Sequence, residues 1–254
     1  MQEKTLTGGR SYYLDIARTI AIISISLNHA VNRTYDNYFG QMAEFLESSY
    51  LSSLLKSVAT VFSHLGVPLF LMISGALLPA LNSLLVLRDI PPMDTAVYLF
   101  NLCSIYYLYV FTGYFISQGG LQRLRTGEVA VLTVLLFALI CGYQLYAYSD
   151  WVDYLVDYDF PLLLLCAMGL LELLRRGAEH LRGLRPVVTY LAKISFGIYF
   201  VHILIMSLLY WHMDFSEWSH LWTLLFLEGV SVGGSILLIA LFSLSLIHIS
   251  EPTR

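Results

Sequence analysis

The chain has 254 residues, of which 57% are hydrophobic and 13% are charged, and its formal net charge is −4. A water-soluble domain carries about 25% charged residues, so this composition excludes an ordinary soluble fold. The few charges are scattered and form no basic stripe, so we expect no nucleic-acid partner. The composition predicts a chain that is embedded in membrane lipid.

Seven apolar stretches are long enough to cross a hydrocarbon core about 30 Å thick as helices. They lie at approximately residues 12–31, 57–80, 95–117, 128–148, 160–174, 187–210 and 221–246. Because backbone groups in lipid must bond internally, runs of this length favour helices over barrel strands. The sequence therefore predicts one all-α, polytopic transmembrane helix bundle over residues 1–243. Pro68 should kink the second stretch, since it cannot donate to the carbonyl of His64.

The arginines of the short loops disagree with a simple alternation of these seven spans. Lys and Arg of short loops face the cytoplasm, and Lys4 and Arg10 therefore predict a cytoplasmic N-terminus. Alternation would then place the arginines of segments 123–125 and 175–185 outside. An odd number of additional spans between residues 79 and 95 would reverse these assignments, so we predict that spans are missing there.

The last residues have a different character from the rest of the chain. Residues 244–254, LSLIHISEPTR, resemble a translated sequencing-library adapter. We therefore exclude this segment from the predicted domain and assign no site role to His248 or Glu251.

The first stretch carries Asp15, Arg18, Asn28 and His29 in an otherwise apolar sequence. Ionisable residues in a membrane span are costly and mark functional sites by default. Arg18 and His29 are eleven residues apart, which places them on one helical face about 16 Å apart along the axis. Asp15 lies one turn before Arg18 and is expected to pair with it. The alternative is that Arg18 extends to the membrane interface and His29 caps the outer end.

Two other stretches contain polar residues that could contact a substrate. Ser74 and Gly75 offer a hydroxyl and a point of close backbone approach, although small residues are also common where membrane helices pack together. Ser195, Tyr199 and His202 recur at intervals of four and three residues and therefore share a helical face. They could position a substrate hydroxyl, or form a polar cluster between helices.

The remaining polar and sulfur-containing residues of the spans are expected to have no chemical role. Cys103, Cys141 and Cys166 lie singly in apolar runs without disulfide or metal spacing, so we interpret them as packing residues. Glu172 and Glu228 lie near span edges and are expected to be interfacial. No metal site is predicted.

Three segments together resemble acyltransferase family 3 of membrane proteins. YYLDIARTIAIISISLNHA, residues 12–30, is similar to that family's first-span pattern of Asp-x-x-Arg followed by His. GVPLFLMISGALL, residues 66–78, resembles its second-span signature, and SFGIYFVHILI, residues 195–205, resembles its penultimate-span signature of Ser-x-Gly-Ile-Tyr-x-x-His. A weaker similarity to a middle span covers YYLYVFTGYFI, residues 106–116.

The resemblance implies a bacterial inner-membrane O-acyltransferase with about ten spans and a cytoplasmic N-terminus, so that about three spans would be missing here. It implies transfer of an acyl group, most often acetyl from acetyl-CoA, to a hydroxyl of a cell-envelope polysaccharide. The catalytic residues implied are His29, Arg18 and Asp15; the substrate-binding residues expected are Ser74, Ser195, Tyr199 and His202.

The resemblance also suggests roles for the first-span residues. His29 could accept a proton from the acceptor hydroxyl or carry the acyl group transiently. Arg18 could bind a phosphate of the donor or stabilise an oxyanion, with Asp15 orienting it. Two alternatives stay open: a transporter or flippase-like protein whose buried charges line a permeation path, and a nonfunctional truncated fragment.

Overall fold

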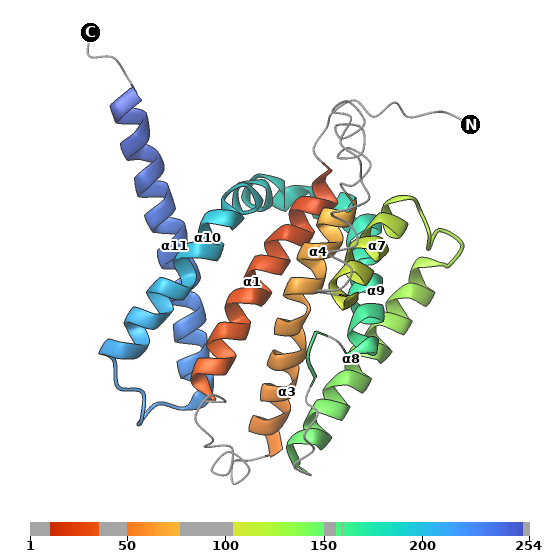
Figure 1. Cartoon of the computed structure of the whole chain (residues 1–254), viewed down its shortest axis with the longest axis horizontal. Coiled ribbons are helices and arrows are strands. Elements are labelled where there is room, and N and C mark those ends of the chain that lie inside the picture. Colours follow the sequence, from red (N-terminus) through yellow and green to blue (C-terminus); the bar gives the residue numbers. More distant parts are fainter. Residues whose placement is uncertain (1–10, 36–49, 77–103, 150–155, 159, 251–254) are drawn as a thin grey trace.

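A computed structural model describes residues 11–35, 50–76, 104–149, 156–158 and 160–250 of the chain. These residues form α-helices and one 3-10 helix, and no strand occurs among them. The helices are α1 (Tyr12–Thr34), α3 (Tyr50–His64), α4 (Gly66–Ala76), α7 (Ser104–Ser117), α8 (Thr126–Ser149), α9 (Pro161–Gly177), η1 (Ala178–Leu184), α10 (Arg185–His212) and α11 (His220–Ser250). The prediction of an all-α bundle is confirmed (Figure 1).

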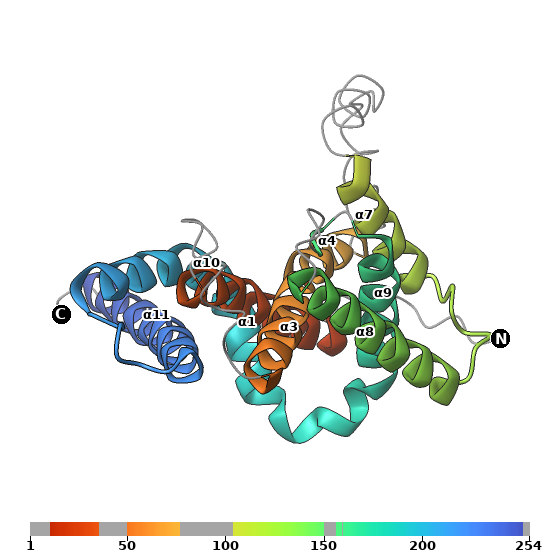
Figure 2. The same ribbon diagram turned by 90° about the horizontal axis from the view of Figure 1, so that it is seen from below.

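The first helix occupies the centre of the bundle. α10 and α11 lie on one side of α1, and α3, α4, α7, α8 and α9 lie on the other (Figures 1 and 2). In the most apolar 18-residue window of each helix, 72% of the residues of α1 are buried, against 22% for α11. Polar side chains on α1 therefore face other helices and not lipid.

The outer helices carry the surface expected of a protein in lipid. Large apolar side chains on α8, α10 and α11 are more than half exposed, including Val134, Phe196, Leu204, Trp222 and Leu237. A soluble protein seldom exposes apolar patches of this extent. The chain is an integral membrane protein.

Five helical stretches of the described chain are long and apolar enough to cross a membrane, compared with the seven predicted. The difference has two sources. α9 and α10 belong to one continuous helical stretch, Pro161–His212, which turns at η1, where Leu181 leaves helical geometry. α7 is described over only 14 residues, because the first part of its predicted span lies outside the described residues.

The predicted kink of the second span is confirmed. α3 ends at His64 and α4 begins at Gly66. At the break, the N–H of Leu65 donates to the carbonyl of Phe62, three residues back, at 3.1 Å. Pro68 has no N–H for the carbonyl of His64, and the missing bond accounts for the interruption.

The second span also begins seven residues earlier than predicted, because the helix includes Lys56. The Lys56 side chain is only 1% exposed, and its Nζ lies 4.3 Å from the ring centroid of Tyr148 and 5.0 Å from that of Tyr35. Aromatic faces attract a cation through their quadrupole, which lowers the cost of burying this charge. Hydropathy does not indicate that these tyrosines, which lie on other parts of the chain, contact Lys56.

The arginine-bearing loops lie at the same end of the bundle as the start of α1. The Tyr12 hydroxyl donates to the carbonyl of Leu181 at 2.7 Å, and the Arg185 guanidinium lies 5.5 Å from the Tyr12 ring centroid. Arg176 donates to the carbonyl of Leu121 in the α7–α8 connection at 2.7 Å. We call this the arginine end; α8 starts near it and ends at the opposite end of the bundle (Figure 1).

This arrangement agrees with the positive-inside rule and not with simple alternation of seven spans. α1 and α10 both start at the arginine end, so they run in the same direction (Figure 1). The predicted gap between residues 79 and 95 lies outside the described residues, and missing spans there stay a prediction.

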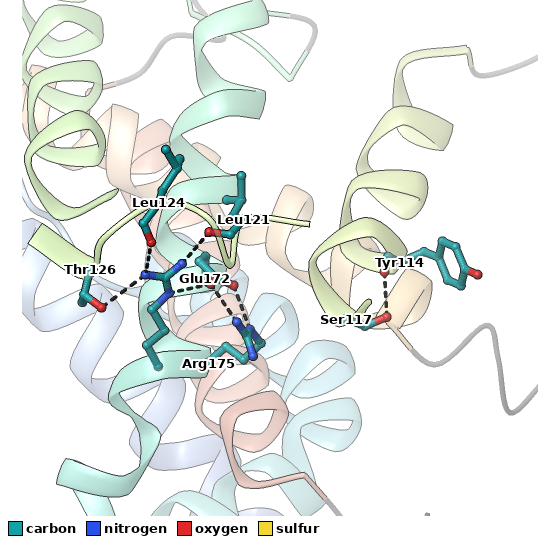
Figure 3. Close-up of polar contacts among 8 residues, drawn as sticks. Tyr114, Ser117, Leu121, Leu124, Thr126, Glu172 and Arg175 are labelled. Carbon is teal, nitrogen blue, oxygen red and sulfur yellow. Dashed lines mark hydrogen bonds and ion pairs between the residues drawn. The ribbon is translucent and has the colours of Figure 1, made fainter. Parts of the chain in front are cut away.

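A buried carboxylate holds the arginine end together (Figure 3). The side chain of Glu172 is 0% exposed and accepts two hydrogen bonds of 2.8 Å from Arg175 and one of 2.5 Å from Arg176. Arg176 also donates to the carbonyls of Leu121 and Leu124 at 2.7 and 2.9 Å. Glu172 lies near the end of α9, as expected, and the arginines three and four residues later provide its partners inside the protein.

Gly75 marks a close contact between helix backbones, as predicted. A Cβ atom added to Gly75 would overlap the carbonyl oxygen of Val110 on α7, and one added to Gly113 would overlap that of Met72 on α4. Cys141 and Cys166 are buried and free, consistent with packing roles, whereas Cys103 lies outside the described residues.

Gly75→Ala is expected to lower the unfolding temperature of the detergent-solubilised protein, because the new methyl group meets backbone that cannot rotate away. The cost of such overpacking is about 1–3 kcal/mol. Gly142→Ala is the matched control, since nothing lies within 4 Å of the added Cβ. Equal melting temperatures for the two variants would contradict the contact between α4 and α7.

Glu172→Gln is expected to destabilise the protein by the order of 3 kcal/mol, because it removes the buried charge that two arginines share. Glu179→Gln serves as control: Glu179 pairs with Arg182, but both side chains are about two-thirds exposed or more. Exposed pairs contribute less than about 1 kcal/mol. Thermal unfolding followed by circular dichroism measures both, and similar losses would contradict the proposed importance of Glu172.

Candidate active site

The candidate site lies where α10 packs along α1. Thr19 donates to the carbonyl of Val188 at 3.3 Å, and further along the two helices Arg33 donates to the hydroxyl of Ser207 at 3.4 Å. The helices therefore stay in register over several turns. This register places residues 195–202 of α10 against residues 18–29 of α1, so the two predicted polar faces meet.

Two histidines approach each other at one end of this contact. The ring centroids of His29 and His202 are 5.5 Å apart, with an angle of 48° between the ring planes. His29 is half-buried and His202 is fully buried. The Tyr199 ring centroid lies 6.1 Å from that of His202. The structure thus brings together three of the predicted site residues from two helices.

A cavity of about 260 Å³ lies beside this contact, toward the arginine end. Its lining residues come from α1, α4 and α10: Arg18, Ile22, Ile25, Val67, Phe70, Leu71, Ser195, Phe196 and Tyr199. Most of the wall is apolar, and its polar groups are the Arg18 guanidinium and the hydroxyls of Ser195 and Tyr199. Apolar pockets with a few placed polar groups are typical of small-molecule sites.

The hydroxyls in the cavity differ in their availability. Ser195 is 6% exposed and donates to the carbonyl of Ala192 at 3.0 Å, so only its oxygen lone pairs remain for a ligand. Tyr199 is 45% exposed, and its hydroxyl makes no hydrogen bond within the described residues. Tyr199 is therefore the better placed of the two to donate to a ligand.

Two predicted residues lie differently from what was expected. Asp15 is 4% exposed and accepts a hydrogen bond of 3.4 Å from Thr189, whereas an ion pair with Arg18 is absent from this part of the structure. The expected pairing is wrong, because Asp15 points to the first turns of α10 while Arg18 points into the cavity. Ser74 is exposed, donates to the carbonyl of Phe70 at 3.3 Å, and lies one turn beyond the cavity wall.

Glu228 of α11, which the sequence predicts to lie near the membrane interface, is half-buried and bonds to the central helix. One carboxylate oxygen, Oε2, accepts a hydrogen bond of 2.8 Å from Ser26, one turn before His29 on α1. The other, Oε1, is buried without a hydrogen-bond partner in the described part of the chain. Sequence spacing does not indicate this contact with α1, although an acidic residue within the last span suggests a polar partner.

Within the described residues, no three His, Cys, Asp or Glu side chains are grouped as metal ligands would be. The candidate site consists of imidazole, guanidinium and hydroxyl groups around an apolar cavity.

The fold and this set of groups define a membrane-embedded protein with a small, mostly apolar site, and comparison with known families identifies its class. The model of a family described as an acyltransferase domain matches residues 11–91 and 90–244, which together cover most of the chain. The chain belongs to acyltransferase family 3, and it is a membrane acyltransferase. Comparisons with curated proteins and with solved structures found no match.

Proposed function

We propose that this protein is an O-acyltransferase that moves an acyl group, acetyl in the simplest case, from acyl-CoA to a hydroxyl of a cell-envelope carbohydrate. The observation that carries the proposal is the approach of His29 to His202 beside a cavity lined by Arg18, Ser195 and Tyr199. Imidazole next to a cavity that contains a few polar groups is suited to proton transfer during acyl transfer.

The positions of the charges support a direction for the reaction. The arginine end corresponds to the cytoplasmic side of a bacterial inner membrane by the positive-inside rule, and α1 begins there. Arg18 lies in the half of α1 nearest to that end, and His29 lies about 16 Å further along the helix. The cytoplasmic donor then enters past Arg18, and the carbohydrate acceptor reaches His29 from the opposite side.

The separation of Arg18 and His29 favours one of the two roles considered for the arginine. At about 16 Å, the two side chains do not act on the same reacting carbon. Arg18 therefore binds a phosphate of CoA, for which a forked, permanently charged guanidinium is suited. Ile22 and Ile25, which lie between them in the cavity wall, contact the less polar parts of the donor.

The chemistry at His29 follows from these positions. Its unprotonated nitrogen takes the proton of the acceptor hydroxyl as that oxygen forms a bond to the thioester carbon. The Tyr199 hydroxyl donates to the developing oxyanion. The carbon–sulfur bond then breaks, and His29 returns the proton to the CoA thiolate. A transient acyl-imidazole at His29 would give the same products in two steps.

The match to the family also bears on the architecture. The match falls into two segments that meet at residues 90–91, within the stretch 79–95 where the charges predict missing spans. This supports a parent protein with additional helices around the same site. Within the proposal, residues 1–243 form one acyltransferase domain, and residues 244–254 belong to an adapter.

His29→Ala is expected to lower acyl transfer by about 100-fold or more, because general-base catalysis contributes about that much. The measurement is the acetyl content of surface carbohydrate in cells that express the full chain, determined by mass spectrometry. His212→Ala is the control, since His212 is an exposed histidine at the other end of α10. Unchanged acetylation by His29→Ala would contradict the proposal, and no acetylation by the unaltered chain would favour the truncated-fragment alternative.

Arg18→Gln is expected to raise the KM for acyl-CoA by about 10- to 100-fold, the equivalent of one charge-assisted hydrogen bond. Steady-state release of CoA by purified protein in lipid vesicles measures this effect. A transporter predicts a different result: carbohydrate flux into the vesicles without acyl-CoA, abolished by the same substitution. Flux of this kind, together with an unchanged KM, would overturn the enzyme assignment.

A further inference from the structure

We propose that His202 is the positioning residue of the site: its buried Nε2 accepts the ring N–H of His29 and so fixes the tautomer and orientation of that imidazole. The inference rests on the proposed function, because it assigns a purpose to the His29–His202 approach. It differs from the sequence-based expectation, in which His202 contacts substrate directly.

The tautomer of His202 follows from its own helix. Its Nδ1 lies 2.8 Å from the carbonyl oxygen of Ile198, which can only accept, so Nδ1 carries the hydrogen. In the neutral ring, Nε2 then has a free lone pair. His64 and His212 make the same bond to Thr60 and Leu208, so this bond alone does not indicate a function.

The surroundings of Nε2 distinguish His202 from these other histidines. His202 is 0% exposed, and its Nε2 is buried without a hydrogen-bond partner within the described residues. Leaving such an atom unpaired is unfavourable, because burial removes its hydrogen bond to water. The centroid of the His29 ring lies 5.5 Å from that of the His202 ring. Ring nitrogens lie at the ring edge, so small rotations bring them to about 3 Å, a normal hydrogen-bond length.

His29 has the complementary property. Its ring makes no hydrogen bond within the described part of the chain, so its own helix does not select its tautomer. If His29 donates one N–H to His202, its other nitrogen must be unprotonated in the neutral ring, as a base requires. The Tyr199 ring, 6.1 Å from His202, lies on the cavity side of the pair.

The proton balance of acyl transfer is unchanged by this contact. When His29 takes the acceptor proton, it becomes an imidazolium that still directs its original N–H at His202. The lone pair of His202 then stabilises the new charge without taking the proton. When His29 gives its proton to the CoA thiolate, both rings return to their starting states.

The test uses the full chain, labelled with ¹⁵N-histidine and placed in lipid nanodiscs, and reads the tautomer of His29 from its imidazole nitrogen signals. His29→Gln identifies those signals by their loss. The expected result is one tautomer of His29 in the unaltered chain, kept in His202→Gln, whose amide oxygen can accept the same N–H. In His202→Leu both tautomers should appear, while His212→Gln changes nothing.

Activity provides a second readout. Loss of a residue that orients a reactive imidazole commonly costs about 10- to 100-fold, so His202→Leu should fall in that range and His202→Gln should recover most of the loss. If His202→Leu does not accumulate, His202→Phe keeps a ring without an acceptor. A mixture of tautomers in the unaltered chain, the same tautomer in all variants, or equal effects of Gln and Leu would overturn the inference.

These outcomes are distinct from failure of the proposed function. The tautomer is observed without acyl-CoA, acceptor or turnover. An inactive chain that shows the expected tautomer pattern would support the positioning role and contradict only the acyltransferase activity of this chain. Retained activity with an unchanged tautomer in His202→Leu would support the acyltransferase activity and contradict the positioning role of His202.

Discussion

The packing of α1 between two groups of helices is the constraint on which the site depends. On one side α10 runs along α1 in register; on the other, α4 begins at Gly66, where an added Cβ would lie 2.9 Å from the carbonyl oxygen of Ala21. The close approach at Gly66 and the register of α10 leave the cavity between α4 and α10, with Arg18 in its wall. In lipid, polar groups on a central helix need protein partners, and this packing supplies them.

The distribution of polar groups along the contact favours a catalytic site over a permeation path. Between Arg18 and His29, the α1 residues in the cavity wall are Ile22 and Ile25, so on α1 the two polar groups are separated by an apolar section, and α10 adds only the hydroxyls of Ser195 and Tyr199. A path for a hydrated solute would need polar groups in that section. An apolar section between an arginine, for which we propose phosphate binding, and an imidazole instead suits a long donor that is charged at one end and reactive at the other.

Much of the fold was predictable because membrane helices are specified by local properties. Apolar length indicated the spans, Pro68 indicated the kink, and helical spacing placed Arg18 and His29 on one face. The failures concern partners on other helices, which spacing does not identify. Asp15 bonds Thr189 and not its neighbour Arg18, and Glu228 bonds Ser26 inside the bundle. The contact between His29 and His202 joins two spans, so the pattern of either span alone does not indicate it.

The contacts of Arg176 with the α7–α8 connection have a consequence for membrane insertion. The carbonyls of Leu121 and Leu124 precede α9 in the chain, so they have already reached their membrane surface when α9 is synthesised. The carbonyl groups that accept from Arg176 are thus synthesised before the last turn of α9. Glu172 and its two arginine partners belong to the same helix. All partners of this contact are therefore synthesised before α10, so it can form without waiting for the helix that completes the site.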